Sequence, residues 1–471
     1  MIFMIMACSL ATSIKLNLEM KRLIYLIILT ASIISQELTA QEKKWTLEDC
    51  INYAITNNIN LQRQKLLTES AEVNYLKARM DILPNLNLGA DANLGFGRSI
   101  NPVTNLYTFK QNFGNQYSAN SQVDLFRGLV NLNTISANKF LYKAGVESEK
   151  IAQNTLVVDI LGQYYQVIYT KGLEEASKMK LEQSEKQLFR IRKTVETGKE
   201  AVSKQYEMES RASADRLDYT IAQSSAEQAL TTLKQILQLE SDIDFDVIMP
   251  ELDKLIITDS DYEPDSVYRI ASEVLPRLRA IEYDLQATKR QYAASKGYVA
   301  PRLTAGGTLY TGYYKVVNDT ETGLEQDSFT TQLKNNNSQG LWVSLSIPIF
   351  NNYTTGRNIK IARIRMDDAA LRLQLEKNNL YTEIENACLD FNRGKDEFMA
   401  AASNLEFNKK SFSAVEKKFE SGLVDVTDYS AAKTTLFTAE TELLRTKLQV
   451  LIRKLTIQLY STGDYQNLIY N

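Results

Sequence analysis

The chain has 471 residues, 24% of them charged, and a formal net charge of −3, so it offers no basic surface of the kind that binds nucleic acid. It contains no histidine, which removes the commonest general base and the commonest metal ligand. No nucleophile–base pair, phosphate-binding loop or metal-ligand spacing is present, so we expect a protein that is not an enzyme, with no catalytic residue, cofactor or metal.

The first 40 residues have the pattern of a secretory signal peptide. Lys21 and Arg22 precede an apolar run over 23–34, and Ala40 follows as a small residue at the expected cleavage point. The run is shorter than the ~20 residues that a membrane-spanning helix needs. We therefore predict that residues 1–40 direct export and are removed, with Met20 as an alternative start of the chain.

Very long helices are predicted where proline is absent. The seven prolines leave 103–249 and 349–471 uninterrupted, and a proline inside a helix costs ~3 kcal/mol. The predicted helices are 46–82, 131–197, 199–238, 265–299, 356–421 and 425–461. The two longest reach ~100 Å each, and the shorter ones would stack in pairs beside them as antiparallel coiled coils.

Between these helices, four segments change to a period of two. They are 85–97, 116–125, 303–313 and 341–349, in which apolar residues alternate with Asn, Gln, Ser, Thr, Asp or Gly. This pattern is typical of transmembrane barrel strands with one face in lipid and one in water. A half-buried sheet of a soluble protein is the alternative, but aromatic residues near the strand ends favour a membrane interface.

Four strands are too few to close into a barrel. An open sheet edge in lipid leaves backbone groups unpaired at a cost of several kcal/mol each, so several copies of the chain must share one barrel. Dimers, trimers and tetramers all reach the minimum of about eight strands. The pattern of residues does not choose among them.

The same order of elements occurs twice in the chain. Leu188, Ile191 and Val195 before Gly198 recur 224 positions later as Phe412, Val415 and Phe419 before Gly422. Upstream the offset is 217, since Leu83-Pro84 matches Ala300-Pro301. We therefore predict an internal duplication. The first repeat is 41–238, with a strand hairpin at 85–125 and a turn at Gly198. The second is 265–461, with a strand hairpin at 302–350 and a turn at Gly422.

The segments outside the repeated elements are polar. Residues 98–114 and 315–339 are predicted loops that close the two strand hairpins, and the longer second copy places its extra residues in 315–339. Residues 239–264 form an acidic linker between the repeats. That linker forms either one or two strands packed on the helices or a solvated connection. Residues 462–471 form a C-terminal tail.

Together these features resemble the TolC family of outer membrane efflux channels. The resemblance rests on the signal peptide, the two copies, the strand hairpins between long helices, and Ser421-Gly422-Leu423-Val424 followed by Thr427-Asp428. It covers about 41–463. It implies a mainly α fold with membrane β-structure: long antiparallel coiled-coil helices form a periplasmic α-barrel, and four strands per protomer contribute to a twelve-stranded transmembrane β-barrel in a homotrimer.

The resemblance also implies a function. The protein would be a passive exit duct in the cell outer membrane, surrounded by outer membrane lipid, with its helices in the periplasm. It would serve efflux or secretion by docking with a periplasmic adaptor protein and an inner membrane transporter. A non-transport coiled-coil envelope scaffold or adhesin is the alternative, but a scaffold has no use for strands with a lipid-facing side.

Particular residues acquire roles from the same resemblance. Gly198 and Gly422 would form the periplasmic tips, and Gly422, Leu423 and Val424 would match the family's adaptor-docking motif, although both glycines are also explained as helix C-caps. Lys199 follows Gly198 where the motif has leucine, so the first turn does not match the docking motif. Asp428 would form a ring of gate carboxylates across three copies, or simply favour the helix dipole. Ala431 occupies the family's second aspartate position.

Overall fold

A computed structural model describes residues 44–100, 105, 107–109, 111–240, 243–249, 262–317 and 327–465. The predicted signal peptide lies outside these residues, as do 250–261 of the acidic linker and 466–471 of the predicted tail. The described chain forms two compact units. The first unit takes its residues from the segments up to Tyr53 and from Gln163 to Leu255, and the second takes the remainder.

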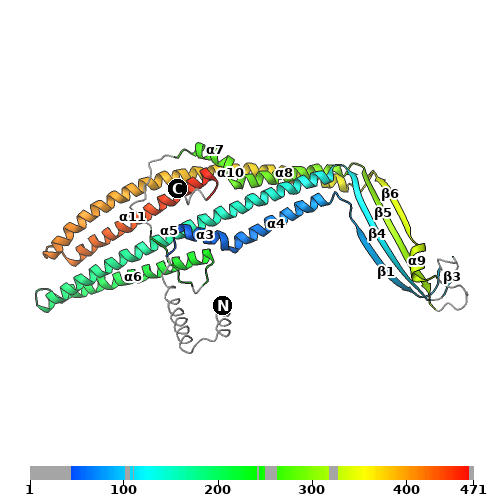
Figure 1. Cartoon of the computed structure of the whole chain (residues 1–471). Coiled ribbons are helices and arrows are strands. Elements are labelled where there is room, and N and C mark those ends of the chain that lie inside the picture. The colour runs from blue at the N-terminus through cyan, green and yellow to red at the C-terminus, as the bar shows by residue number, and fades with distance from the viewer. Residues whose placement is uncertain are drawn as a thin grey trace, which may run out of the picture. The chain divides into compact units, whose positions relative to one another are not determined.

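Helices make up most of the described chain, as predicted (Figure 1). Their bounds are α3 Leu47–Asn57, α4 Ile59–Met80, α5 Val130–Glu196, α6 Val202–Leu237, α7 Pro264–Val274, α8 Pro276–Gly297, α9 Phe329–Asn335, α10 Thr354–Glu420 and α11 Val426–Thr462. The two predicted long helices are confirmed as α5 and α10, with 67 residues each. Among the described residues, no helix combines the length and the apolar character needed to cross a membrane.

Two of the predicted helices are wrong in one respect, because each is broken near its beginning. The helix predicted over 46–82 is interrupted at Asn58, whose extended backbone (ψ 122°) lets its side chain accept a hydrogen bond from the Leu61 N–H. The helix predicted over 265–299 is interrupted at Leu275 (ψ 125°). Pro276 causes that break, since a proline disfavours helical backbone in the residue before it and starts the next helix well.

The predicted strands form one antiparallel sheet in the order β1-β4-β5-β6. Their bounds are β1 Asn87–Gly95, β4 Asn112–Arg127, β5 Arg302–Val316 and β6 Ser338–Ser346. β4 and β5 are longer than predicted. The strand predicted over 341–349 ends at Ser346, before Pro348, which has no N–H for a strand ladder. β1 and β6 are the two outer strands, and their side chains are almost all exposed.

The predicted loops contain structure that the polar composition did not reveal. A small hairpin joins β2 Ser99–Ile100 to β3 Tyr107–Thr108, and α9 lies in the second loop. Helix α9 packs beside β5, where the buried Gln332 side chain both accepts from the Tyr314 N–H at 3.0 Å and donates to the Tyr314 carbonyl at 3.1 Å. This amide takes the place of a strand partner, because β6 pairs with β5 only as far as Tyr310.

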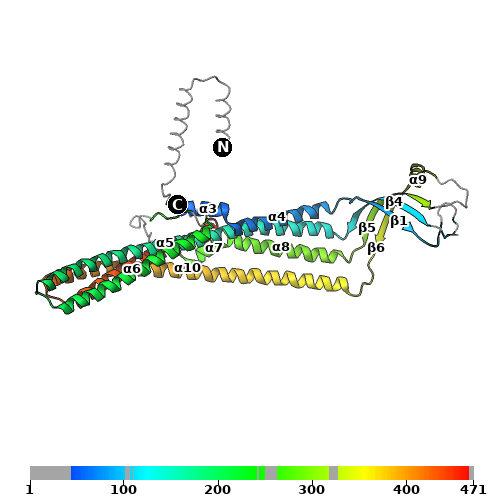
Figure 2. The same cartoon turned by 90° about the horizontal axis from the view of Figure 1, so that it is seen from below.

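In the second unit, α4, α5, α8 and α10 lie side by side in that order (Figure 2). Thr68 of α4 donates to the Gly145 carbonyl of α5 at 3.0 Å, the rings of Phe140 in α5 and Tyr283 in α8 have centroids 6.2 Å apart, and α8 packs along α10. Along the chain, α4 leads into β1, β4 into α5, α8 into β5 and β6 into α10. The order of these helices is therefore the same as the order of the strands in the sheet. Consequently α4 with β1 forms one edge of this unit, and β6 with α10 forms the other.

The main apolar core of the second unit lies where α7, α8, α10 and α11 meet. Its fully buried members include Leu278, Leu380, Ile384, Phe391 and Ile457. These side chains come from helices far apart in the sequence. Burial of each such side chain stabilises the fold by about 1.5 to 3 kcal/mol, so this cluster holds the short helices against α10.

In the first unit, the second half of α5 packs against α6, and the start of the described chain packs against the linker. Trp45 and Val247 form an isolated parallel β-bridge. Its hydrogen bonds run from Trp45 N to Asp246 O at 2.8 Å and from Ile248 N to Trp45 O at 2.9 Å. The Trp45 ring makes edge contacts with Tyr53 and Phe245. The described part of the acidic linker is therefore partly structured and packed, rather than only solvated.

The backbones at Gly128 and Gly297 approach each other closely in the second unit, so a side chain at Gly297 is predicted to disturb the packing there. A methyl group on Gly297 would overlap the Gly128 carbonyl oxygen, whereas one on Gly162 would meet no atom within 4 Å. We expect Gly297→Ala to destabilise the protein by about 1 to 3 kcal/mol through overpacking. Gly162→Ala, in a helix interior, should be neutral or stabilising by up to about 1 kcal/mol. Thermal unfolding followed by circular dichroism would check this, and equal midpoints for the two variants would contradict it.

Candidate functional site

The two predicted turns have the same backbone structure. Gly198 and Gly422 adopt left-handed φ values of 73° and 72°, and no atom lies within 4 Å of where a side chain would begin. Each turn closes with the paired hydrogen bonds of a Schellman motif. These are Gly198 N to Val195 O, Lys199 N to Thr194 O, Gly422 N to Phe419 O and Leu423 N to Lys418 O, at 2.9, 2.9, 3.0 and 2.9 Å. Glycine is therefore favoured here by the left-handed backbone conformation, which the C-cap interpretation predicts.

The chain leaves the two turns differently. After Gly422, the Leu423 side chain is 75% exposed, Val424 is half-buried, and Asp425 caps α11 by accepting from the Asp428 N–H at 2.8 Å. The first turn continues into α6 after Ala201, which provides no side-chain cap. The structure thus brings Gly422, Leu423, Val424 and Asp428 together in one capped turn, with an apolar side chain at its surface.

An aromatic cluster supports the second turn. The Tyr429 ring is fully buried and stacks on Phe419, with centroids 4.4 Å apart, and its centroid lies 5.7 Å from that of Phe412. Aromatic pairs of this kind contribute about 0.5 to 1.5 kcal/mol beyond their area. The first hairpin has Gln205 at the position 224 residues before Tyr429, so it lacks the aromatic ring that packs beneath the second turn.

Asp428 is exposed in the first turn of α11. A carboxylate at a helix N-terminus is stabilised by the helix dipole, typically by about 0.3 to 1 kcal/mol. Among the described residues, no group of three acidic or cysteine side chains is placed to hold a metal ion. Within one chain, therefore, Asp428 has the environment of an ordinary helix-end carboxylate.

The first hairpin has a buried charge pair that sequence reasoning missed. The Lys180 ammonium lies 2.9 Å from the Asp215 carboxylate, and both side chains are about nine-tenths buried. Ser184 donates to the same carboxylate, and the more exposed Asp218 lies 3.0 Å from Lys180. Burial acts to lower the pKa of Lys180, but hydrogen bonds and attraction from Asp215 and Asp218 outweigh it and raise the pKa.

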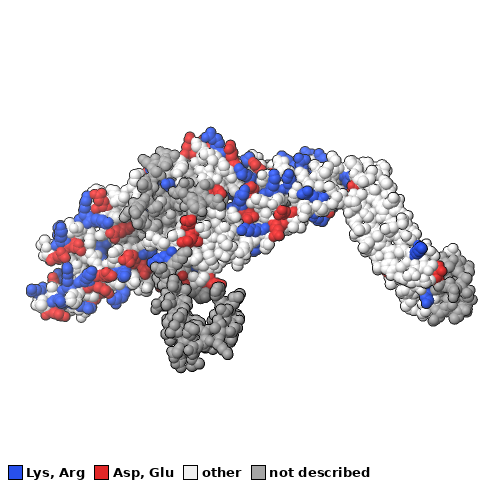
Figure 3. Space-filling model, in the orientation of Figure 1, with Lys and Arg blue, Asp and Glu red and all other residues white. Residues whose placement is uncertain are grey.

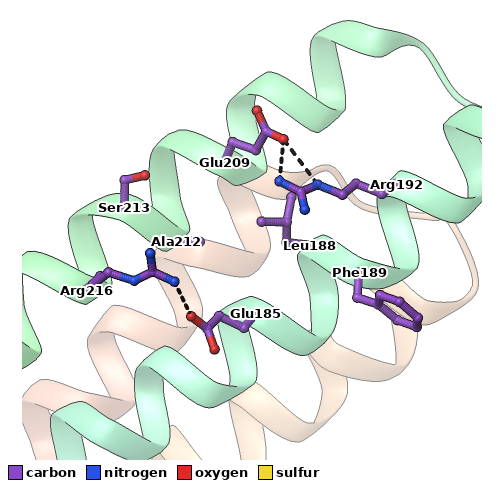
Figure 4. A pocket seen from close by; sticks show the side chains of 8 residues that line it. All are labelled: Glu185, Leu188, Phe189, Arg192, Glu209, Ala212, Ser213 and Arg216. Carbon is purple, nitrogen blue, oxygen red and sulfur yellow. Dashed lines mark hydrogen bonds and ion pairs between the residues drawn. The ribbon is translucent and has the colours of Figure 1, made fainter.

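Near the first turn, α5 and α6 enclose an open groove of about 630 Å³ (Figure 4). Leu188 and Ala212 contribute apolar side chains to its lining. Two ion pairs cross from one helix to the other: Arg192 to Glu209 at 2.7 Å and Glu185 to Arg216 at 2.5 Å. The hydrogen bond from Arg192 holds the pKa of the Glu209 carboxyl below its usual value. The last two lining residues are Phe189 and Ser213.

The four charges of this groove are reversed in the second hairpin. At the positions 224 residues later, the chain has Lys409 for Glu185, Glu416 for Arg192, Lys433 for Glu209 and Glu440 for Arg216. The reversal is visible in the sequence once the offset is applied, so it could have been found there. The burial of Lys180 and Asp215 could not, since both occur on helices with many charged residues. The two hairpins therefore present different charge patterns to any partner.

Comparison with known proteins identifies the class. The family model described as "Outer membrane efflux protein" matches residues 50–238 and 267–461. The chain belongs to this outer membrane efflux protein family. The predictions of an efflux channel function and of location in the outer membrane with a helical periplasmic part are thereby confirmed, and the scaffold or adhesin alternative is not favoured. The family comprises channels rather than enzymes.

Three solved structures of similar fold are distant from this chain in sequence. The Campylobacter jejuni CmeC outer membrane channel is 15% identical with a TM-score of 0.74, over 90% of this chain and 88% of that one. The Vibrio cholerae outer membrane protein VceC is 14% identical with a TM-score of 0.71, over 89% and 96%. The open state of the Neisseria gonorrhoeae MtrE channel is 18% identical with a TM-score of 0.69, over 88% of each chain. No curated protein matches the sequence.

The buried pair in the first hairpin can be tested directly. Asp215→Ala removes a buried carboxylate from contact with Lys180, and we expect a loss of about 3 kcal/mol of stability because a buried charge then lacks that counterion. The matched control is Glu406→Ala, whose ion pair with Lys410 is exposed and should contribute little to stability. Thermal midpoints measured in detergent should fall clearly for Asp215→Ala alone; an equal fall in both variants would contradict a special role for burial.

Proposed function

We propose that this chain is one protomer of a passive exit duct in which three copies form a twelve-stranded β-barrel in the outer membrane and an α-helical tunnel in the periplasm. The observation that carries the proposal is the sheet of the second unit. Its outer strands, β1 and β6, each have one unpaired edge within the described chain. Their apolar side chains are exposed, including Leu88 at 79% and Leu341 at 94%. Neither property suits a solitary chain.

The surface of the sheet supports a lipid environment. Figure 3 shows few charged side chains over the strands on the face in view, whereas the helices carry many. Leu86, Leu94, Val343 and Leu345 add to the exposed apolar surface, each more than half exposed. A strand of nine residues, as in β1 and β6, is long enough to span the apolar core when tilted. Lipid on one face and partner strands at both edges account for these exposures together.

The helical edges support assembly of several copies in the same way. Along α4, Ile59, Leu66, Val73 and Met80 repeat every seven residues and are 49% to 63% exposed. On α10, at the opposite edge of the four helices, Ile364, Leu371 and Leu375 are 57% to 66% exposed. Heptad stripes of this kind pack against a second helix in coiled coils. A neighbouring copy would cover both stripes, as it would cover both strand edges.

The proposed assembly is built from two repeats per chain, 41–238 and 265–461, joined by 239–264. Matching helix lengths, equal in three pairs and one residue apart in the fourth, support this division: 11, 22, 67 and 36 residues in α3 to α6, against 11, 22, 67 and 37 in α7, α8, α10 and α11. The helix breaks at Asn58 and Leu275 also fall 217 positions apart. Three copies of two similar halves would give a ring with approximate sixfold symmetry.

The proposed partners are a periplasmic adaptor protein and an inner membrane transporter. Gly422, Leu423 and Val424 are the proposed docking residues, supported by the exposed leucine on a rigid, capped turn. The first turn exposes Lys199 instead, followed by the half-buried Glu200, which pairs with Lys204, so docking there would be polar. One similar structure is described as an open channel state, and another concerns conformational changes that accompany channel formation. The duct proposed here would open at its helical end, where the proposed gate residue Asp428 lies in the first turn of α11.

A planar lipid bilayer tests the duct directly. Protein purified from outer membranes should produce stepwise single-channel conductance, because the account requires a continuous water-filled path. Outer membranes purified in the same way from cells that lack the protein control for contaminating channels. Absence of conductance from a correctly inserted, folded preparation would contradict the duct and favour a structural role.

Asp428 is proposed as the gate residue. Three copies would bring three Asp428 carboxylates to one axis, where their repulsion favours a bound cation. With Ala431 in the second position, one carboxylate ring gives a weak block by divalent cations. We expect Asp428→Ala to abolish that block in the bilayer, and Asp425→Ala, which removes the cap instead, to leave it in place. An unchanged block in Asp428→Ala would rule out the gate role and leave only the helix-dipole role.

A further inference from the structure

We propose that the pairing of β4 with β5 and of α5 with α8 within one chain is the template for pairing between copies. In that arrangement β6 and α10 of one copy contact β1 and α4 of the next copy at the equivalent register. The inference rests on the proposed assembly and adds the specific residues that meet. It follows because the elements at the two edges are the repeat counterparts of the elements in the middle: β1 and α4 correspond to β5 and α8, and β6 and α10 correspond to β4 and α5.

The first support is that the two strand hairpins share one register. In β1 and β4, Asn87 lies opposite Asn120. Adding the sequence offsets of 217 and 224 gives Thr304 and Ser344, which lie opposite each other in β5 and β6. The same holds at the far end of the shared stretch, where Asn93 opposite Gly114 corresponds to Tyr310 opposite Ser338. The offsets therefore transfer pairings between repeats without slippage.

The junctions between sheet and helices are equivalent too. The two residues before α5, Gly128 and Leu129, have left-handed φ values of 58° and 61°. Their counterparts before α10, Asn352 and Tyr353, have values of 53° and 61°. A non-glycine residue in this conformation is uncommon, so its repetition at the same position indicates the same path from strand to helix. β4 with α5 and β6 with α10 are thus structural equivalents.

The middle of the sheet then specifies the missing interface. Within the chain, β4 and β5 pair regularly from Gln116 opposite Gly312 to Gln122 opposite Gly306. Shifted by the offsets, this stretch becomes seven pairs between copies, from Gly340 to Ser346 of β6 opposite Gly95 to Gly89 of β1 in the next copy. Both segments lie inside strands with an unpaired edge. The pairing would satisfy backbone groups that lipid cannot satisfy.

The faces of the side chains agree with this register. It places Leu341 opposite Leu94 of the next copy and Val343 opposite Ala92 of the next copy, which keeps apolar side chains on one face. On the other face, Ser344 lies opposite Asp91 of the next copy. A slip of one residue would instead set Val343 opposite Asn93 or Asp91 of the next copy, an apolar side chain opposite a polar one. The faces alone exclude odd slips, and the repeat selects one register among the even ones.

The two outer strands are also offset along the sheet, as the strands of a closed barrel are. The residues of β4 that pair with β1 pair on their other side with 308–316 of β5. Strand β6, in contrast, pairs with 302–310 of β5. This stagger amounts to six residues across the four strands. Strands in a closed barrel are tilted and their register is staggered around the ring. If β6 pairs with β1 of the next copy at the transferred register, the same six-residue stagger is repeated in every copy around the ring.

The helices give a second, independent pair of residues. Phe140 of α5 contacts Tyr283 of α8, and the offsets convert this contact to Ile364 of α10 with Leu66 of α4 in the next copy. Both aliphatic side chains are exposed, at 57% and 63%. Nearer the sheet, the crossing of Gly128 with Gly297 becomes Asn352 with Met80. These larger side chains make the junction between copies wider than the one within the chain.

Paired cysteine substitutions test the register. The background replaces Cys50 and Cys388, the buried free cysteines of the described residues, with alanine. The matched strand pair is Leu341→Cys with Leu94→Cys, and the control pair is Leu341→Cys with Ala92→Cys, a slip of two residues on the same face. Oxidation in outer membranes should give about tenfold more covalently linked chains for the matched pair, because only directly opposite residues approach disulfide distance.

The helical pair is tested with a short bismaleimide reagent. Ile364→Cys with Leu66→Cys should link chains, and Ile364→Cys with Val73→Cys, displaced by ~10 Å along α4, should link them about tenfold less. Stronger linkage in the control pairs, or no linkage in an assembled oligomer, would overturn the transferred register while leaving the duct intact. No linkage together with a monomeric mass would instead contradict the proposed assembly itself.

Discussion

The backbone hydrogen-bonding groups at the edges of the four-stranded sheet are the constraint on which the proposed assembly depends. Inside the sheet, β1, β4, β5 and β6 satisfy one another, and the Gln332 side chain satisfies part of β5 beyond the end of β6. The outer edges of β1 and β6 have no such partner within the described chain. In lipid, each unpaired group would cost several kcal/mol, and partner strands from other copies remove that cost.

The helices of the second unit also leave surfaces uncovered at both edges, but these surfaces are apolar side chains and not backbone groups. Their outer members, α4 and α10, expose heptad stripes of aliphatic side chains. The inner helices α5 and α8 pack against each other, as the rings of Phe140 and Tyr283 do. A repeated half-chain explains why both ends of one chain carry the counterparts of its own middle. The two turns show where the repeats diverge, since one turn carries Leu423 and a capping Asp425 and the other carries Lys199 and no cap.

The sequence predicted the elements whose signal is periodic and long. The 67-residue helices and the four strands were found from proline placement and alternation, and both turn glycines adopt the expected conformation. It did not predict the break at Asn58, where one side chain caps the next helix, or α9, whose Gln332 acts through a tertiary contact. The buried pair of Lys180 and Asp215 was also missed, because burial depends on which helix faces meet and not on composition.

The central claim is that the functional unit is a ring of chains rather than a single chain. The most direct measurement is the native mass of the protein extracted from outer membranes in mild detergent, compared before and after heating. The account predicts a complex of three mature chains that heat converts to single chains, because strand and helix edges hold it together without covalent bonds. Recovery of single chains from the unheated membrane extract, or of a soluble monomer, would contradict it.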